Sequence, residues 1–86
     1  MVSCKIQWDS RALKELRKLP REAAVRILKA VSALDNDPLS GLPLKGAFQS
    51  FRKLRIGEYR VIYSFLKDVA IIQILRVAHR REVYRS

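Results

Sequence analysis

The chain has 86 residues, which is the length of one small domain, and we expect a single domain over residues 1–86. Its hydrophobic fraction of 49% is ordinary for a globular protein and argues against disorder. Lysine and arginine total 18 and aspartate and glutamate total 8, which gives a formal net charge of +10. So large an excess is self-repulsive unless an anionic partner relieves it, so we expect nucleic acid, an acidic protein or both to bind.

The residue content also excludes several kinds of site. Cys4 is the sole cysteine, so an internal disulfide is impossible and a reducing cytoplasm is expected. The first residues lack the apolar run of a signal peptide, and the stretch 69–75 is too short to span a bilayer. Metal-ligand spacing, a Gly-rich phosphate loop and a Cys–His pair are all missing from the sequence, so neither a metal nor a cofactor is expected.

The N-terminal part predicts a strand followed by a helical hairpin. Val2–Trp8 alternates in part between apolar and polar residues, as a half-buried strand does. Asp9 and Ser10 suit the N-cap of a helix over Arg11–Leu19. A second helix is predicted over Pro20–Leu34, since proline is accepted in a first helical turn. Its apolar face would consist of Ala24, Ile27, Leu28, Val31 and Leu34.

The C-terminal part predicts a meander of strands. After a loop at 39–46 with glycine and proline punctuation, the hydrophobic period changes from helical to alternating. The predicted strands are Phe51–Ile56, Tyr59–Leu66 and Val69–Val77. This order predicts an α+β fold: a three-stranded antiparallel meander with the helices packed on one face of an antiparallel sheet. The first strand would pair at an edge or lie between others.

The hairpin around Gly57-Glu58 carries the charge pattern that points to function. Glycine at the first turn position favours a type II′ turn. The resulting register sets Arg55 opposite Arg60, with Ile56 opposite Tyr59, Leu54 opposite Val61 and Lys53 opposite Ile62. Because side chains alternate along a strand, the helices would cover one face, made of Leu54, Ile56, Tyr59, Val61 and Tyr63. The other face would carry Lys53, Arg55 and Arg60.

Two facing arginines destabilise a strand pair, so a structural protein gains little from this arrangement. A phosphate-binding surface does gain, because guanidinium groups match phosphate oxygens with two parallel hydrogen bonds. The alternative is an ordinary solvated face whose basic side chains bend away from each other. We favour the phosphate-binding surface.

A second group of candidate residues follows the last strand: His79, Arg80, Arg81 and Tyr84. It combines an imidazole, two guanidinium groups and a phenol at one end of the sheet. Arginine can hold phosphate, and tyrosine can stack on an unstacked base. Alternatively, Tyr84 anchors the C-terminus and His79 is a surface residue at a strand end. Since a Cys–His pair, metal-ligand spacing and a carboxylate pair are all missing from the sequence, any catalysis would rest on basic residues, with Tyr84 as a candidate partner.

Four stretches in the right order resemble the RelE/ParE toxin superfamily and together cover nearly the whole chain. They are a first-helix stretch at Asp9–Pro20, the motif Leu44-Lys45-Gly46, the hairpin Phe51–Tyr63 and the tail Val77–Tyr84. The resemblance implies a RelE-like toxin of a type II toxin–antitoxin system in the prokaryotic cytoplasm. Such a toxin is a metal-independent endoribonuclease that cuts messenger RNA in the ribosomal A site.

The resemblance also implies catalytic roles, residue by residue. Lys53 matches a sheet lysine proposed as the base, and Arg60 matches the arginine that binds or stabilises the phosphate. Arg80 matches the C-terminal arginine, and Tyr84 matches the tyrosine that stacks on the substrate.

The same resemblance implies supporting residues and shows where this sequence differs from the family pattern. Lys45 and Arg55 match supporting basic positions, and we add His79 and Arg81 as RNA-binding candidates. Phe51 stands where the family has a further sheet lysine, and Arg81 fits the catalytic arginine position as well as its neighbour does.

Two other functions stay open at this point: a ParE-like inhibitor of DNA gyrase that cuts no RNA, and an inert basic RNA-binding module. The implied partners are messenger RNA, the ribosome and an acidic RelB-like antitoxin, and no membrane. We expect the antitoxin to wrap the domain with an extended, partly helical segment. The toxin would be a monomer when free and part of a hetero-oligomer with its antitoxin.

Overall fold

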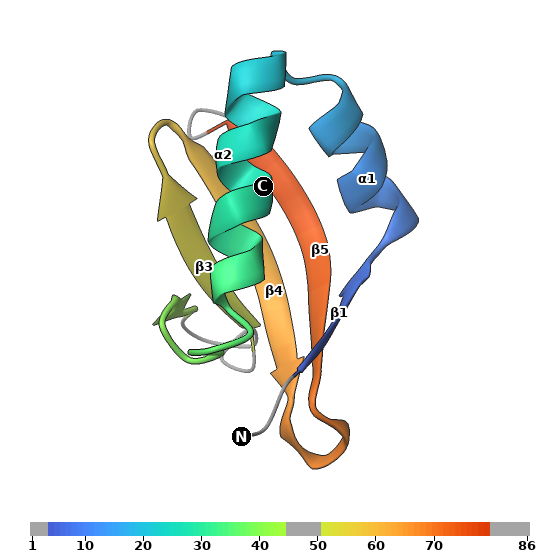
Figure 1. The fold of residues 1–86 in the computed structure, drawn as a ribbon, viewed down its shortest axis with the longest axis vertical. Coiled ribbons are helices and arrows are strands. Elements are labelled where there is room, and N and C mark those ends of the chain that lie inside the picture. The colour runs from blue at the N-terminus through green and yellow to red at the C-terminus, as the bar shows by residue number, and fades with distance from the viewer. Residues whose placement is uncertain (1–3, 45–50, 80–86) are drawn as a thin grey trace.

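A long helix crosses one face of a mixed β-sheet, and a shorter helix lies along the edge of that sheet (Figure 1). The structure is a computed structural model that describes residues 4–44 and 51–79. Within these residues the strand order is β1-β5-β4-β3-β2. The elements are β1 (Lys5–Trp8), α1 (Ser10–Arg17), α2 (Arg21–Ala33), β2 (Leu42–Pro43), β3 (Phe51–Ile56), β4 (Tyr59–Leu66), the 3₁₀ turn η2 (Lys67–Val69) and β5 (Ile71–His79). The predicted α+β class is confirmed.

Both helices begin where the sequence indicates. Asp9 is the N-cap of α1, and its carboxylate accepts a hydrogen bond from the Arg11 N–H at 3.3 Å. Pro20 precedes α2 as its N-cap residue, one position before the first helical turn in which it was predicted to lie. The predicted helical hairpin is therefore present, with boundaries shifted by one to two residues.

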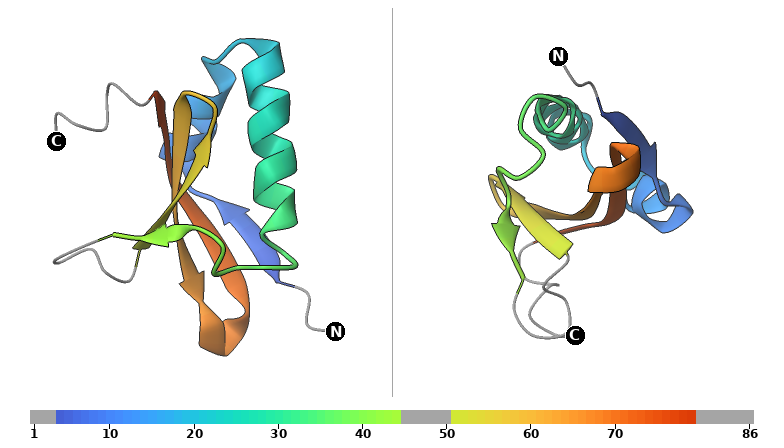
Figure 2. Two further views of the ribbon diagram at one scale, coloured as in Figure 1. Left: turned by 90° about the vertical axis from the view of Figure 1, so that its left-hand side faces the viewer. Right: turned by 90° about the horizontal axis from the view of Figure 1, so that it is seen from below.

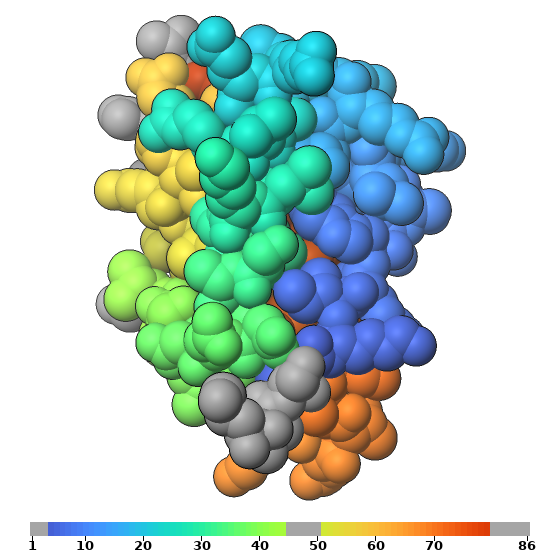
Figure 3. All heavy atoms as spheres, in the orientation of Figure 1, coloured from blue at the N-terminus to red at the C-terminus, as the bar shows by residue number. Residues whose placement is uncertain are grey.

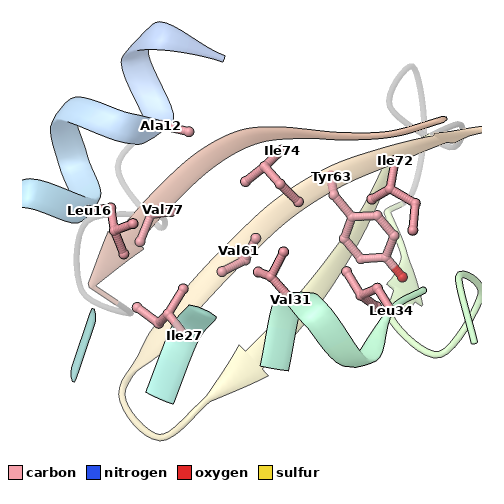
Figure 4. Close-up of a cluster of buried hydrophobic side chains, with 10 residues drawn as sticks. All are labelled: Ala12, Leu16, Ile27, Val31, Leu34, Val61, Tyr63, Ile72, Ile74 and Val77. Carbon is pink, nitrogen blue, oxygen red and sulfur yellow. The ribbon is translucent and has the colours of Figure 1, made fainter. Parts of the chain in front are cut away.

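The core lies between α2 and the sheet (Figure 4). Its buried residues come from both helices and the strands β4 and β5: Ala12, Leu16, Ile27, Val31, Leu34, Val61, Tyr63, Ile72, Ile74 and Val77. Each large apolar side chain buried in this way contributes about 1.5–3 kcal/mol. Seen from this side, the helix side chains cover most of the sheet (Figure 3).

One predicted core residue of α2 lies outside this layer. Leu28 is 43% exposed, whereas Ile27 and Val31 are buried. Successive helical residues are rotated by about 100°, so Leu28 follows Ile27 around the helix and away from the sheet. The apolar stripe of α2 is narrower than the sequence pattern predicted.

The meander has the predicted β3–β4 register, with Arg55 opposite Arg60 and Lys53 opposite Ile62. Gly57 has φ +58° and Glu58 does not have a positive φ, as the predicted hairpin turn requires. β5 begins two residues later than expected. The 3₁₀ turn η2 and Ala70, at φ +52°, take up the intervening chain.

The predicted antiparallel sheet is wrong at one edge and gains an unpredicted antiparallel strand at the other. β1 pairs with β5 in parallel, so the sheet is mixed. The two helices lead the chain from β1 to the opposite edge of the sheet. The antiparallel strands β3, β4 and β5 then cross back, and β5 lies beside β1 and runs parallel to it. At the far edge, Leu42–Pro43 forms a strand where a loop was predicted. Two residues give no detectable alternation, and proline is tolerated only at such an edge.

A carboxylate from α1 closes the edge of β5 where β1 stops pairing. The Asp9 N–H donates to the Ile74 carbonyl at 2.9 Å, which among the described residues is the last main-chain bond on this edge of β5. Beyond it, a side chain of α1 takes the place of a neighbouring strand. The Val77 N–H donates to Glu15 Oε1 at 2.9 Å. The Arg76 guanidinium donates to the same carboxylate, with Nη2 2.9 Å from Oε2. Glu15 thus continues the hydrogen bonding of the sheet edge.

Replacing this carboxylate should destabilise the fold. We expect Glu15→Ala to lower the free energy of unfolding by about 1–3 kcal/mol, because the Val77 N–H and Arg76 lose their acceptor. Urea denaturation followed by circular dichroism measures the loss. The matched control is Glu22→Ala, which removes the same charge from the first turn of α2 and should cost less than about 1 kcal/mol. Equal losses in both variants would contradict the edge-closing role.

Candidate nucleic-acid interface

The three predicted sheet cations share one face of the β3–β4 hairpin. Arg55 pairs with Arg60 across the strands, and Lys53 lies two residues along β3 on the same side. The alternate positions, Val61 and Tyr63, point into the core under α2. Viewed along the sheet, α2 lies on one side of the hairpin only (Figure 2). The expected common face is confirmed.

The three cations of this face differ in their exposure to solvent. Arg55 is exposed and Lys53 is half-buried, but Arg60 is only 3% exposed. β4 is flanked by β3 and β5, so Arg60 has strand neighbours on both sides. The residue opposite it on β5 is the small Ala78. Arg60 is therefore a buried side chain and not a freely solvated one.

The positive charge of this face is poorly balanced. Among the described residues, neither Lys53 nor Arg55 takes part in an ion pair. The ion pairs that the described residues form lie elsewhere, between Arg76 and Glu15 and between His79 and Glu58. A phosphate chain would thus meet two cations that no carboxylate of the described part neutralises, which favours anion binding.

The structure separates His79 from the sheet cations. Its position on β5 is opposite Tyr59, on the face that carries Val77 and the core. The imidazole packs edge-on against the Tyr59 ring, with centroids 5.4 Å apart, and Nε2 lies 3.4 Å from a carboxylate oxygen of Glu58. His79 therefore lies on the other face of the sheet from Lys53, Arg55 and Arg60, and its RNA-binding role stays a prediction.

The other predicted site residues lie outside the part of the chain that the structure describes. They are Lys45, Arg80, Arg81 and Tyr84. Within residues 4–44 and 51–79, no cluster of acidic, histidine or cysteine side chains could hold a metal ion. No helix in the same ranges is long and apolar enough to cross a membrane.

A loop held against β3 adds a feature that the sequence pattern did not indicate. The Tyr63 hydroxyl donates to the Pro38 carbonyl at 2.8 Å and accepts the Gly41 N–H at 2.9 Å. Arg52 Nη1 donates to the carbonyl oxygens of Gly41, at 2.6 Å, and Leu39, at 3.2 Å. The signal available was a tyrosine at a core position, since a buried phenol needs a hydrogen-bond partner.

Gly41 lets this loop approach the strand closely. A Cβ atom there would lie 2.6 Å from the Tyr63 oxygen and 2.8 Å from the Lys53 carbonyl oxygen, so no larger residue fits. The loop then forms one wall of a pocket of about 230 Å³ at the edge of β3. We call it the β2–β3 pocket, and its lining residues are Ser40, Leu42, Lys53, Leu54 and Arg55.

Known toxins resemble this chain over nearly its whole length. The family model described as "ParE toxin of type II toxin-antitoxin system, parDE" matches residues 6–84. Toxin RelG of Mycobacterium tuberculosis is 30% identical over 82 residues, which cover 93% of this chain and 94% of the relative. This chain is a RelE-like toxin of the RelE/ParE superfamily.

Further relatives agree with this assignment. The mRNA interferase toxin RelE of Escherichia coli K12 is 30% identical over 83 residues, covering 92% of this chain and 87% of that protein. The toxin–antitoxin complex RelBE2 of M. tuberculosis contains a chain that superposes with a TM-score of 0.84 at 30% identity, with 92% and 100% of the two chains covered. Isolated E. coli RelE superposes with a TM-score of 0.75 at 26% identity, covering 95% of this chain and 92% of that one.

The described parts of the stretches that resemble the superfamily lie on elements that adjoin one another in this RelE-like toxin. Asp9–Pro20 contains α1, and Phe51–Tyr63 contains β3, the turn and the start of β4. The tail stretch begins in β5, next to the strand that bears Arg60. The fold therefore brings stretches that are distant in the sequence together on α1 and the adjacent strands β5, β4 and β3.

The loop wall should also give the stability of the toxin a pH dependence. Burial raises the pKa of Tyr63 above its usual 10.0, and this outweighs the lowering effects of the Gly41 hydrogen bond and the Arg52 charge. The folded state then holds this proton more tightly than the unfolded state does. Its contribution is complete below about pH 10 and is lost as the pH rises through the folded-state pKa.

We expect the free energy of unfolding of the wild type to fall above pH 10 more steeply than that of Tyr63→Phe. Urea denaturation between pH 8 and 11 measures both slopes, and the lysines common to both proteins cancel in the comparison. At neutral pH the variant should be less stable by about 1–3 kcal/mol, because the Pro38 carbonyl and Gly41 N–H lose their partner. Parallel pH curves would contradict the assignment.

Proposed function

We propose that this RelE-like toxin cleaves messenger RNA in the ribosomal A site and thereby stops translation. The observation that carries the proposal is the common face of Lys53, Arg55 and Arg60 on the β3–β4 hairpin. The relative in E. coli named as an mRNA interferase supports it, and so do the toxin homologues across nearly the full length of the chain. Because its target would be the translating ribosome, we place the toxin in the cytoplasm.

The chemistry would use the RNA's own nucleophile. The 2′-hydroxyl attacks the adjacent phosphorus, the bond to the 5′-oxygen breaks, and the products are a 2′,3′-cyclic phosphate and a free 5′-hydroxyl. The reaction needs a proton acceptor at the 2′-oxygen, charge stabilisation at the phosphorane and a proton for the leaving oxygen. None of these roles demands a metal ion.

The sheet residues are assigned to the first two roles. Lys53 accepts the proton of the 2′-hydroxyl, and Arg60 binds the phosphorane oxygens. Because Arg60 is 3% exposed, its side chain is largely shielded from water before the substrate arrives. A fixed charge in a poorly hydrated site needs little reorganisation and acts more strongly than a solvated one. Arg55, exposed beside it, holds a neighbouring phosphate.

The remaining roles belong to residues outside the described part. Arg80 or Arg81 would stabilise or protonate the leaving oxygen, Tyr84 would stack on the displaced base, and Lys45 would hold backbone phosphate. These side chains are weak general acids and bases at neutral pH. Much of the rate would then come from the ribosome, which holds the RNA in line for attack.

Removing a sheet cation should strongly reduce cleavage. We expect Lys53→Ala and Arg60→Ala each to lower cleavage on translating ribosomes by about 10²-fold or more, the scale on which lost charge stabilisation acts. The measurement is mapping of RNA 5′ ends after brief expression. Lys29→Ala, which removes a charge from the exposed side of α2, should keep wild-type activity. Circular dichroism checks that each variant is folded.

Full cleavage by both Lys53→Ala and Arg60→Ala would overturn the proposal. The description of the matching family as the ParE toxin of parDE favours gyrase inhibition as the second candidate. Loss of DNA supercoiling without RNA breaks would establish that candidate instead.

We further propose an acidic RelB-like antitoxin as the protein partner, because solved relatives are toxin–antitoxin complexes and this chain carries a net charge of +10. Expression of the toxin should arrest growth, and co-expression of its antitoxin should restore it. The complex should weaken as salt rises, since exposed charges are screened over about 10 Å at 0.1 M. Titration of the purified complex from 0.05 to 1 M NaCl measures this, and a salt-independent affinity would contradict the electrostatic part.

A further inference from the structure

We propose that the β2–β3 pocket holds one nucleobase of the bound RNA and so sets a nucleotide preference for cleavage. The inference rests on the proposed function, because the pocket opens beside Lys53, the assigned base. Its other lining residues have no part in the chemistry described above, apart from the phosphate contact of Arg55.

The size of the pocket suits a single ring system. Its volume of about 230 Å³ is below the roughly 300–1,000 Å³ of sites for drug-sized ligands. Leu42 and Leu54 provide apolar walls, and Leu42 is 65% exposed in the absence of any ligand. The flat faces of every nucleobase are apolar enough to pack against such walls. An occupant would cover the exposed leucine.

The strand edge supplies polar groups for the rim of a base. Pro43 has no N–H, so its pair with Arg52 is of the non-hydrogen-bonded kind, and the Leu42–Lys53 pair is of the hydrogen-bonded kind. The hydrogen bond from the Leu44 N–H to the Phe51 carbonyl, at 3.0 Å, follows the same alternation. Odd-numbered residues of β3 therefore direct their main-chain groups toward β2.

Arg55 continues this alternation beyond the end of β2. β2 reaches no further along β3 than Lys53, so the N–H and C=O of Arg55 face the edge without a strand partner from β2. Among the described residues, no loop or turn hydrogen bond involves them. One donor and one acceptor side by side match the hydrogen-bonding edge of a nucleobase.

The wall of the pocket is built before any ligand binds. The hydrogen bonds from Tyr63 and Arg52 fix the loop at Pro38, Leu39 and Gly41, immediately beside Ser40 and Leu42. Gly41 packs against β3 so closely that the loop has no room to shift inward. A preformed wall lowers the ordering cost of binding, which is what a specificity pocket requires.

Two cations at the pocket favour a nucleotide over an apolar peptide side chain. Lys53 and Arg55 both line the pocket and project from the face assigned to the RNA backbone. A nucleotide uses all of these features together. Its base lies between Leu42 and Leu54, the polar edge of the base bonds to the Arg55 main chain, and its phosphate contacts Lys53 and Arg55. A segment of the antitoxin at the same edge is the competing occupant, and the experiments below distinguish the two.

The first test removes one apolar wall. Leu42→Ser should lower kcat/KM for cleavage at preferred sites about tenfold, the scale of losing a few methylenes from an apolar pocket. It should also flatten the nucleotide preference at one position relative to the cut, as seen by mapping RNA 5′ ends. The matched control is Val69→Ser on η2, which is 61% exposed against 65% for Leu42 and should leave rate and preference unchanged.

The second test measures binding without cleavage. The ligands are trinucleotides of each base composition with 2′-deoxy sugars, which lack the attacking hydroxyl. We expect base-dependent shifts of the Leu42 and Arg55 amide resonances in the wild type, and no such shifts in Ser40→Trp, whose indole fills the pocket.

The outcomes separate the pocket from the proposed function. If the wild type cleaves RNA while Leu42→Ser and Ser40→Trp match it in rate and preference, the inference is overturned and the proposed function stands. If the wild type cleaves nothing but the trinucleotides shift the pocket amides, the function fails and the base site stands. If the variants cleave normally but escape the antitoxin, the pocket binds peptide and the inference is overturned.

Discussion

The register of β3 against β4 is the constraint on which the rest of the structure depends. A two-residue turn with a positive φ at Gly57 fixes that register. A slip of one residue would exchange the two faces of a strand, sending Lys53 and Arg55 under α2 and core residues into water. Burial of Val61 and Tyr63 on one side therefore secures the placement of the cations on the other. The core and the candidate site are two results of the same pairing.

The two faces of β3 and the adjacent loop act together at the candidate site. Arg52 lies on the helix side of the strand and binds loop carbonyls, while Lys53, the next residue, lies on the uncovered side. Tyr63 reaches the same loop from the core. Arg52 and Tyr63, which hold the loop in place, thus also shape the β2–β3 pocket next to Lys53, which is assigned to catalysis. Substitutions at either kind of position should be interpreted with both roles in mind.

The sequence predicted the elements whose signals are local. The cap at Asp9, the stripe of Ile27 and Val31 and the glycine turn each depend on a few neighbouring residues, and each was correctly placed. The pairing of strands that are distant in the sequence could not be predicted from such local signals. The parallel pairing of β1 with β5 and the two-residue strand β2 follow from how the whole chain closes.

The candidate site shows the same division. Alternation along β3 and β4 predicted the common face of its cations, because that requires only the hairpin. The burial of Arg60 could not be predicted from the hairpin alone, and the loop wall depends on a tyrosine that reaches across 22 positions in the sequence. The opposite placement of His79 follows from its pairing with Tyr59, which the sequence did not specify.

The carboxylate of Glu15 has a consequence for solubility. An uncovered strand edge offers free N–H and C=O groups to any other chain, and edge-to-edge pairing of this kind leads to aggregation. By occupying the Val77 N–H and holding Arg76 over the same edge, Glu15 denies the upper part of β5 to a second copy of the toxin. Intermolecular strand pairing in this part of the sheet is thus discouraged without an extra strand, and a single acidic side chain serves as the barrier.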